Sequence, residues 1–111
     1  MTTYSVLSEM VEKARSQPQV AEELKGFNKT FQFNPEGSEK FYLEIKDGSL
    51  NLKKGEIQGP SATISGQDAV LSDVLSGKLD PVMSFMSGKL KVSGDIFSAQ
   101  KLTSLAKKFR K

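Results

Sequence analysis

The sequence predicts an α+β fold, in which an antiparallel sheet of about five strands is covered on one face by about five helices. Apolar residues recur at helical spacing at both ends of the chain, and they alternate with polar residues in the middle. Asp47-Gly48 joins two of the alternating runs as a hairpin, which favours antiparallel pairing over strands that alternate with helices. At 111 residues, the chain is expected to form one domain over 1–111.

The first segment, residues 4–17, has the spacing of an amphipathic helix. Its apolar residues follow one another at intervals that place them on a single stripe, which consists of Val6, Leu7, Met10, Val11 and Ala14. Pro18 suits a stop after this helix, and residues 20–24 can form one more turn before Gly26.

Three strands are expected next. The sequence Asn-Pro-Glu-Gly at 34–37 predicts a turn between the first two, and Asp47-Gly48 is a preferred hairpin turn between the second and third. Each strand has one apolar face because its apolar residues are two positions apart. These faces are Phe27, Phe31 and Phe33, then Phe41, Leu43 and Ile45, then Leu50 and Leu52.

The second half of the chain alternates between short strands and helices. Residues 61–64 predict a strand, with Ser65 as the cap of a following helix that ends at Gly77. Asp80-Pro81 then has the pattern of an N-cap and first helical residue, before a short and very apolar helix. Residues 90–93 predict a further strand, and Asp95 can cap the last helix. The apolar stripes of the first and last of these helices are Val70, Leu71, Val74 and Leu75, and Ala99, Leu102, Leu105, Ala106 and Phe109.

Composition argues against several classes of function. The chain has no histidine and no cysteine, which excludes Ser-His and Cys-His nucleophiles and His/Cys zinc sites. It contains no Gly-rich phosphate-binding motif, and its net charge of +3 comes from scattered lysines rather than a basic stripe. We therefore expect no enzyme, no catalytic residue, no metal, no cofactor and no nucleic-acid partner. Without a secretion signal, membrane span or peroxisomal C-terminal address, a cytoplasmic monomer is expected.

Three pieces of the sequence resemble the sterol carrier protein type 2 family. They are FYLEIKDGSLNL at 41–52, SGKLDPVMSFMSGKLKV at 76–92 and SGDIFSAQKLTSL at 93–105. Their order along the chain is that of the family. The resemblance implies the sterol carrier fold, with a hydrophobic tunnel between the sheet and the helices. It also implies non-catalytic lipid binding and transfer inside the cell, with a fatty acid, fatty acyl-CoA or sterol as ligand.

The same resemblance implies which residues hold the lipid. We expect the tunnel to be lined by Val74, Leu75, Val82, Met83, Phe85, Met86, Phe97, Gln100, Leu102, Leu105 and Phe109. Without the resemblance, such apolar helical stripes are typical of an ordinary core. Two alternatives therefore stay open: a protein-interaction or regulatory module whose tunnel is closed, and transient membrane-surface contact through the basic tail 107–111. Cations at that position also complement a helix dipole.

Overall fold

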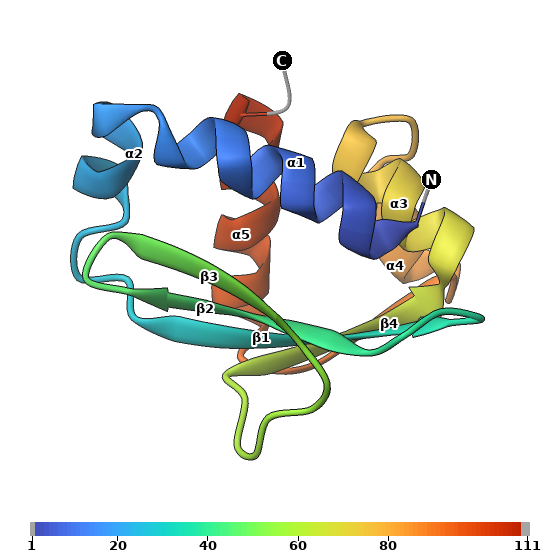
Figure 1. Ribbon diagram of the computed structural model, residues 1–111. Helices are drawn as coiled ribbons and strands as arrows, with labels where there is room; N and C mark the ends of the chain where they lie inside the picture. The colour runs from blue at the N-terminus through green and yellow to red at the C-terminus, as the bar shows by residue number, and fades with distance from the viewer. Residues whose placement is uncertain (1, 110–111) are drawn as a thin grey trace.

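Five helices lie on one face of a five-stranded sheet in the computed structural model, which describes residues 2–109 (Figure 1). The helices are α1 (Thr3–Arg15), α2 (Pro18–Glu23), α3 (Asp68–Ser76), α4 (Pro81–Met86) and α5 (Ile96–Phe109). The strands are β1 (Lys29–Glu36), β2 (Phe41–Lys46), β3 (Ser49–Lys54), β4 (Ala62–Gln67) and β5 (Leu90–Gly94). Among residues 2–109, no helix combines the length and the apolar character needed to cross a membrane.

The predicted α+β layers are confirmed, with one correction to the sheet. Its order is β3-β2-β1-β4-β5, and every neighbouring pair is antiparallel except β1 and β4, which are parallel. Hairpins determine strand direction only for strands that they join directly. The chain reaches β4 from β3 through the long connection 55–61, which passes along the outer face of the sheet (Figure 1). This connection brings β4 in beside β1 in the same direction.

Gln32 holds this crossover connection against the outer face of the sheet. Its side chain is buried, and its Nε2 donates to the carbonyls of Phe41 at 3.1 Å and Gly55 at 3.2 Å. Its Oε1 accepts from the backbone N–H of Ile57 at 2.9 Å. A buried amide with these partners leaves no unsatisfied side-chain polar atom here, so a polar residue is tolerated inside the strand.

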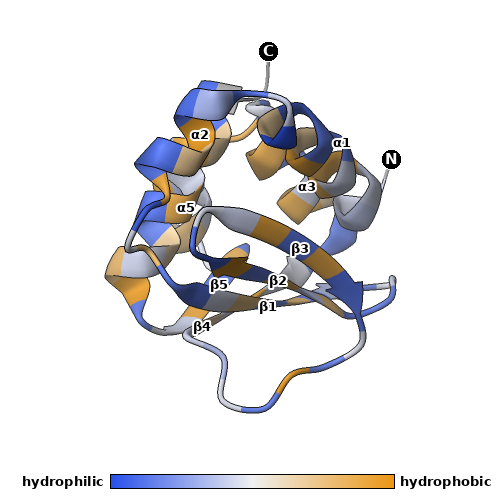
Figure 2. Cartoon of the chain, turned by 60° about the vertical axis from the view of Figure 1, so that its left-hand side comes forward, coloured by the Kyte–Doolittle hydropathy of each residue, from blue (hydrophilic) through white to orange (hydrophobic). Residues whose placement is uncertain are grey.

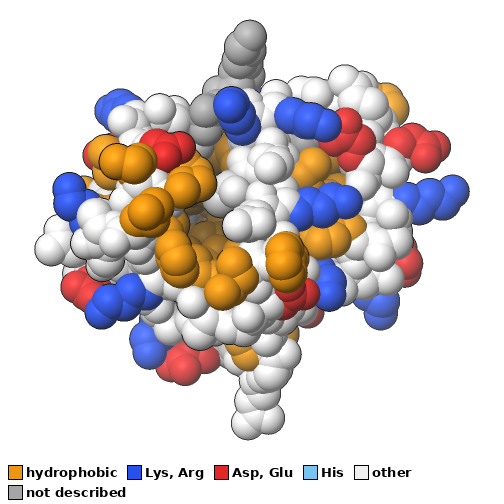
Figure 3. Space-filling view, turned by 180° about the vertical axis from the view of Figure 1, so that it is seen from behind, with side chains coloured by type: hydrophobic (Ala, Val, Ile, Leu, Met, Phe, Trp, Pro, Cys, Tyr) orange, Lys and Arg blue, Asp and Glu red, His pale blue; other side chains and the backbone are white. Residues whose placement is uncertain are grey.

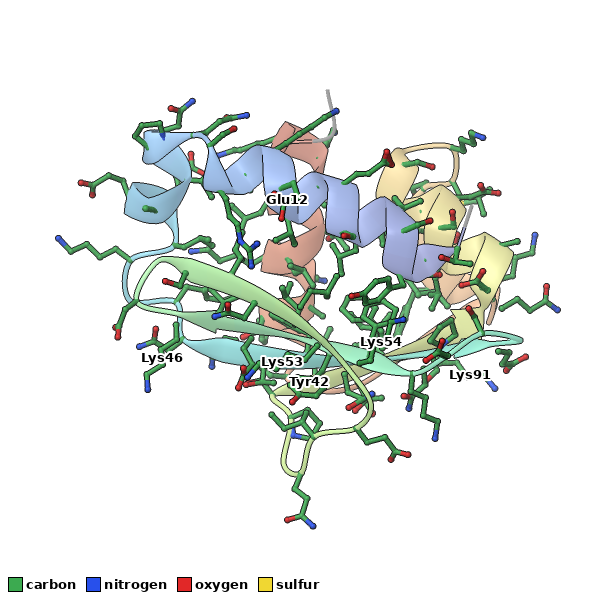
Figure 4. The ribbon with its side chains drawn as sticks, in the orientation of Figure 1. Glu12, Tyr42, Lys46, Lys53, Lys54 and Lys91 are labelled. Atoms are coloured by element: carbon green, nitrogen blue, oxygen red, sulfur yellow. The ribbon has the colours of Figure 1, made fainter. Side chains whose placement is uncertain are left out.

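The core lies between the sheet and the helices. Phe33 and Phe41 stack on neighbouring strands with ring centroids 4.9 Å apart, and Tyr4 from α1 meets Phe41 edge-on at 5.2 Å. Apolar and polar residues alternate along β3 (Figure 2), and this alternation places the polar ones on the outer face. Tyr42, Lys53 and Lys91 point away from the helices (Figure 4). There Lys53 donates to the Glu44 carboxylate at 3.1 Å, and this hydrogen bond raises the pKa of Lys53.

Two local predictions need correction. Ser65 lies within β4 and does not cap α3, because it pairs with both Asn34 of β1 and Lys91 of β5. Helix α3 begins three residues later, at Asp68, whose Oδ1 accepts from the Thr3 N–H at 2.9 Å. Likewise, β1 continues through the predicted turn to Glu36, because its pairing with β4 extends that far.

Candidate functional site

An apolar cavity lies between β1, β4 and β5 on one side and α3, α4 and α5 on the other. Its volume is about 140 Å³. Its lining is Phe33, Ile64, Leu71, Val74, Leu75, Pro81, Val82, Phe85, Leu90, Val92, Ile96, Ala99, Gln100, Leu102 and Thr103. Gln100 and Thr103 are the polar members, and no lining residue is ionisable. Such a surface favours a hydrocarbon over water or an ion.

A wider hollow of about 490 Å³ adjoins this inner cavity. Six residues line both spaces and form the boundary between them: Val74, Leu75, Pro81, Val82, Gln100 and Thr103. The wider hollow also reaches Asp80, Ser104 and Lys107, so its outer part is more polar than the inner cavity. Figure 3 shows a hollow on this face of the molecule, surrounded by hydrophobic side chains.

Local sequence signals position α4 beside this opening. Gly77 ends α3 in the left-handed conformation, with a φ of 88°. The N–H of Lys78 donates a hydrogen bond to the carbonyl of Asp73 at 2.8 Å. The Asp80 carboxylate then accepts from the N–H of Met83 at 3.0 Å and caps α4, with Pro81 as its first residue. Both ends of the connection were predicted, and both predictions are confirmed.

Helix α4 is very apolar, as predicted, yet most of its apolar side chains are not buried. Ser84 is its buried residue, whereas its four large apolar side chains are exposed. A helix of six residues that packs against β5 on one side leaves most of its circumference in solvent. The apolar character of α4 therefore faces the cavity and the solvent rather than a solid core.

The structure brings together six of the eleven side chains predicted to line a tunnel. Val74 and Leu75 from α3, Val82 and Phe85 from α4, and Gln100 and Leu102 from α5 line the inner cavity. Leu105 instead lines a second, smaller cavity of about 40 Å³, between α1, α2, β2, β3 and α5. The side chain of Phe109 lies outside the described part of the structure. Contact of any of these residues with a lipid stays a prediction.

Three of the predicted tunnel residues point elsewhere, and helical geometry gives the reason. Met83 and Met86 are 66% and 76% exposed, because they lie one step round α4 from the cavity-facing pair Val82 and Phe85. Phe97 is 84% exposed for the same reason, since its neighbour Ile96 takes the inward position at the start of α5. These three side chains do not line the cavity in the structure, and their contact with a lipid stays a prediction.

The residues that the prediction missed could have been found from spacing. On α5 the missed residues are Ile96, Ala99 and Thr103, which lie three, four and seven positions apart and line the cavity together with the predicted Gln100 and Leu102. Ile64, Leu90 and Val92 come from β4 and β5, and their pairing depends on a strand order that the sequence does not reveal. In the described residues, no three Asp or Glu side chains gather as a candidate metal site.

Comparison with known proteins assigns the chain to a family. The sequence model of the SCP-2 sterol transfer family matches residues 7–107, and the chain belongs to this family. The chain is 37% identical over 73 residues to the mouse (Mus musculus) peroxisomal multifunctional enzyme type 2, a match covering 65% of this chain and 10% of that enzyme. It is 33% identical over 63 residues to sterol carrier protein 2 of Arabidopsis thaliana, covering 57% of this chain and 51% of that protein.

The fold agrees with this assignment. A solution NMR structure of palmitated SCP2L2 from Aedes aegypti superimposes with a TM-score of 0.74 at 16% sequence identity. The superposition covers 96% of this chain and 95% of that one. The mixed sheet with helices on one face is therefore the sterol carrier fold that the sequence motifs implied.

Proposed function

We propose that this protein binds a lipid by its hydrocarbon chain in the inner cavity and carries it between sites in the cell. The observation that carries the proposal is the apolar cavity, whose polar members Gln100 and Thr103 also line the outer hollow, and we take this shared boundary as the passage to the surface. A hydrocarbon tail fits the inner part, and a polar head fits the passage and the outer hollow. Family membership and a palmitated structural neighbour support the same ligand class.

Cavity size supports a chain that extends through both spaces. An engineered apolar cavity of about 150 Å³ holds one benzene molecule, so the inner cavity accommodates about six carbon atoms. The rest of a long chain needs the wider hollow of about 490 Å³. Burying about 14 methylenes is worth roughly 11 kcal/mol gross, of which association removes several. The remainder is enough for micromolar binding or tighter, with little discrimination between chains of similar length.

Fatty acids, fatty acyl-CoAs and sterols all present the required hydrocarbon, and the proposal covers these three. We further propose that the protein has no catalytic role of its own and acts as a monomer inside the cell. A sequence without histidine or cysteine supports the first of these statements, and the absence of cysteine suits a reducing compartment. The open cavity supports lipid binding over the alternative of a regulatory module with a closed interior.

A substitution that fills the cavity tests the proposal. Ala99 is buried and lines the inner cavity, so Ala99→Phe is expected to occupy the space that a ligand needs. Uptake of a fluorescent fatty acid should be lost in this variant and retained in Ala21→Phe, which adds the same ring to the exposed side of α2. Circular dichroism checks that both variants are folded. Saturable uptake by folded Ala99→Phe, or none by the delipidated wild type, would contradict the proposal.

A further inference from the structure

An apolar surface surrounds the opening of the cavity. Among the side chains that the structure describes, residues 2–108, the large hydrophobic ones that are exposed all belong to α4 and the start of α5, with exposures of 44% to 84%. We call this set the apolar rim: Val82, Met83, Phe85, Met86, Ile96 and Phe97. Scattered exposed hydrophobics need no explanation, but their concentration on one face marks an interaction site. Figure 3 shows hydrophobic side chains gathered around a hollow on one face of the molecule.

The apolar rim is continuous with the cavity. Val82, Phe85 and Ile96 are exposed at the surface and also line the inner cavity. Met83, Met86 and Phe97 lie one helical step away and point outward. A hydrocarbon chain that leaves the cavity past Val82, Phe85 and Ile96 therefore meets the apolar side chains of the rim. A partner in contact with the rim would receive the chain without exposing it to water.

The charges near the rim are mainly positive. Lys78 and Lys89 precede and follow α4 in the sequence, both are exposed, and Lys107 lines the outer hollow. The carboxylates of this region are already engaged: Asp80 caps α4, and Asp95 caps α5 and pairs with Lys29 at 3.3 Å. Exposed apolar side chains with lysines beside them suit a surface that combines hydrocarbon with negative charge.

We propose that the apolar rim docks on an anionic lipid bilayer, with the cavity opening onto the membrane. A second copy of the chain fits less well, because an isologous contact would bring the lysines beside both rims, Lys78, Lys89 and Lys107, into one interface, where the capping carboxylates are already engaged. This inference rests on the proposed function, because docking would serve to exchange a lipid between the cavity and the membrane. Docking itself can be measured without any ligand in the cavity.

The experiment measures co-sedimentation with vesicles of phosphatidylcholine, with and without phosphatidylserine, at low and high salt. The wild type should bind the anionic vesicles at low salt. Met86→Ser combined with Phe97→Ser should weaken that binding by about tenfold or more, since two large apolar side chains no longer insert. Both residues are exposed and lie outside the cavity, so folding and fatty-acid uptake from solution should be unchanged.

Two charge variants separate the contribution of the rim from that of net charge. Lys78→Gln with Lys89→Gln should weaken binding by about fivefold for each lysine. Lys46→Gln with Lys53→Gln removes the same charge from β2 and β3, away from the helices (Figure 4), and should have little effect.

Three results would overturn the docking proposal. They are no binding of the wild type to anionic vesicles, undiminished binding of the serine variant, and equal effects of the two lysine pairs. A dimer in sedimentation that the serine substitutions dissociate would assign the rim to a second copy instead. Fatty-acid uptake is measured separately. If the protein takes up fatty acid but does not bind vesicles, only the docking proposal fails. If the wild type binds vesicles but takes up no fatty acid, only the lipid-binding proposal fails.

Discussion

Leu102 separates two cavities in the middle of the molecule. Its side chain lines both the inner cavity of about 140 Å³ and the second cavity of about 40 Å³. Leu102→Ala is expected to join them and to admit longer hydrocarbon chains, at a cost of about 2–5 kcal/mol in stability. The measurement is the affinity for a series of fatty acids of increasing length.

Leu105→Ala is the matched control for this prediction. Leu105 lies about one helical turn further along α5 and is buried to a similar degree. It lines the second cavity but not the inner cavity. Its truncation should destabilise the fold by a similar amount without changing the preference for chain length. The same change in preference for both variants would show that general loosening, and not the joined cavities, is responsible.

Asp95 is expected to make the stability of the folded state depend on pH. Its carboxylate accepts from the Ser98 hydroxyl at 2.6 Å and the Ser98 N–H at 3.1 Å, and these bonds, with Lys29 adding a smaller effect, lower its pKa to about 2. A depressed pKa stabilises the folded state above the unfolded value near 3.8, and this stabilisation is lost as the pH falls towards 2.

The stability difference between the wild type and Asp95→Asn should therefore be constant above pH 5 or so and shrink between about pH 4 and 2. Urea unfolding at each pH measures it. Ser98→Ala removes the main cause, so NMR titration of the Asp95 carboxyl should give a higher pKa in that variant. An unchanged pKa there would contradict the role given to Ser98.

For single residues, the sequence predicted the helix caps and the apolar helix faces well. It predicted the direction of individual side chains less well. Asp80, Gly77 and Asp95 were identified because each needs only its neighbours in the chain to act. Phe97 was placed in the cavity although Ile96 faces it, because an apolar pair at the start of a helix does not reveal which member turns inward. That choice depends on the position of the whole helix over the sheet.

Among the secondary-structure elements, the junction of β5 and α5 is closely packed against β4. Gly94 has a φ of 91°, and a Cβ there would lie 2.6 Å from the carbonyl oxygen of Ser61. The next residue, Asp95, donates its N–H to that same oxygen at 2.8 Å. Glycine at this position lets the sheet edge and the last helix meet without a collision.

Gly94→Ala should therefore destabilise the protein more than Gly88→Ala. Both positions have a positive φ, which costs alanine about 1–2 kcal/mol, but a Cβ at Gly88 meets no atom within 4 Å. The collision at Gly94 should add about 1–3 kcal/mol to its cost. Urea unfolding midpoints of the two variants test this difference, and equal midpoints would contradict it.

Element boundaries followed from local signals, whereas strand order did not. The turn at Asp47-Gly48 and the helices α1, α3, α4 and α5 lie where the spacing placed them, within a few residues. The parallel pairing of β1 with β4 was missed because it depends on the path of residues 55–61 and on Gln32, which anchors that path from a distant strand. The floor of the cavity depends on that same pairing.

For the whole molecule, the cavity is smaller than the ligand proposed for it. An inner space of about 140 Å³ was not predictable from the sequence, because it results from how α3, α4 and α5 sit together over the sheet. The family resemblance implied a tunnel between these layers, and the structure divides that space into an inner cavity, an outer hollow and a separate smaller cavity. A long chain must therefore use more than one of them.

This division predicts how ligand stabilisation depends on chain length. A ligand that binds only the folded state at about 100 times its Kd adds roughly 2.7 kcal/mol, and for a domain of this size that raises Tm by about 10 °C or more. If the chain continues from the inner cavity into the outer hollow, the increase in Tm should grow from hexanoate through decanoate to palmitate, since each further methylene is buried. Thermal unfolding with matched ligand concentrations measures this series, and Ala99→Phe should abolish the increase throughout. An increase that stops at hexanoate would mean that only the inner cavity takes the ligand and that the outer hollow stays in water.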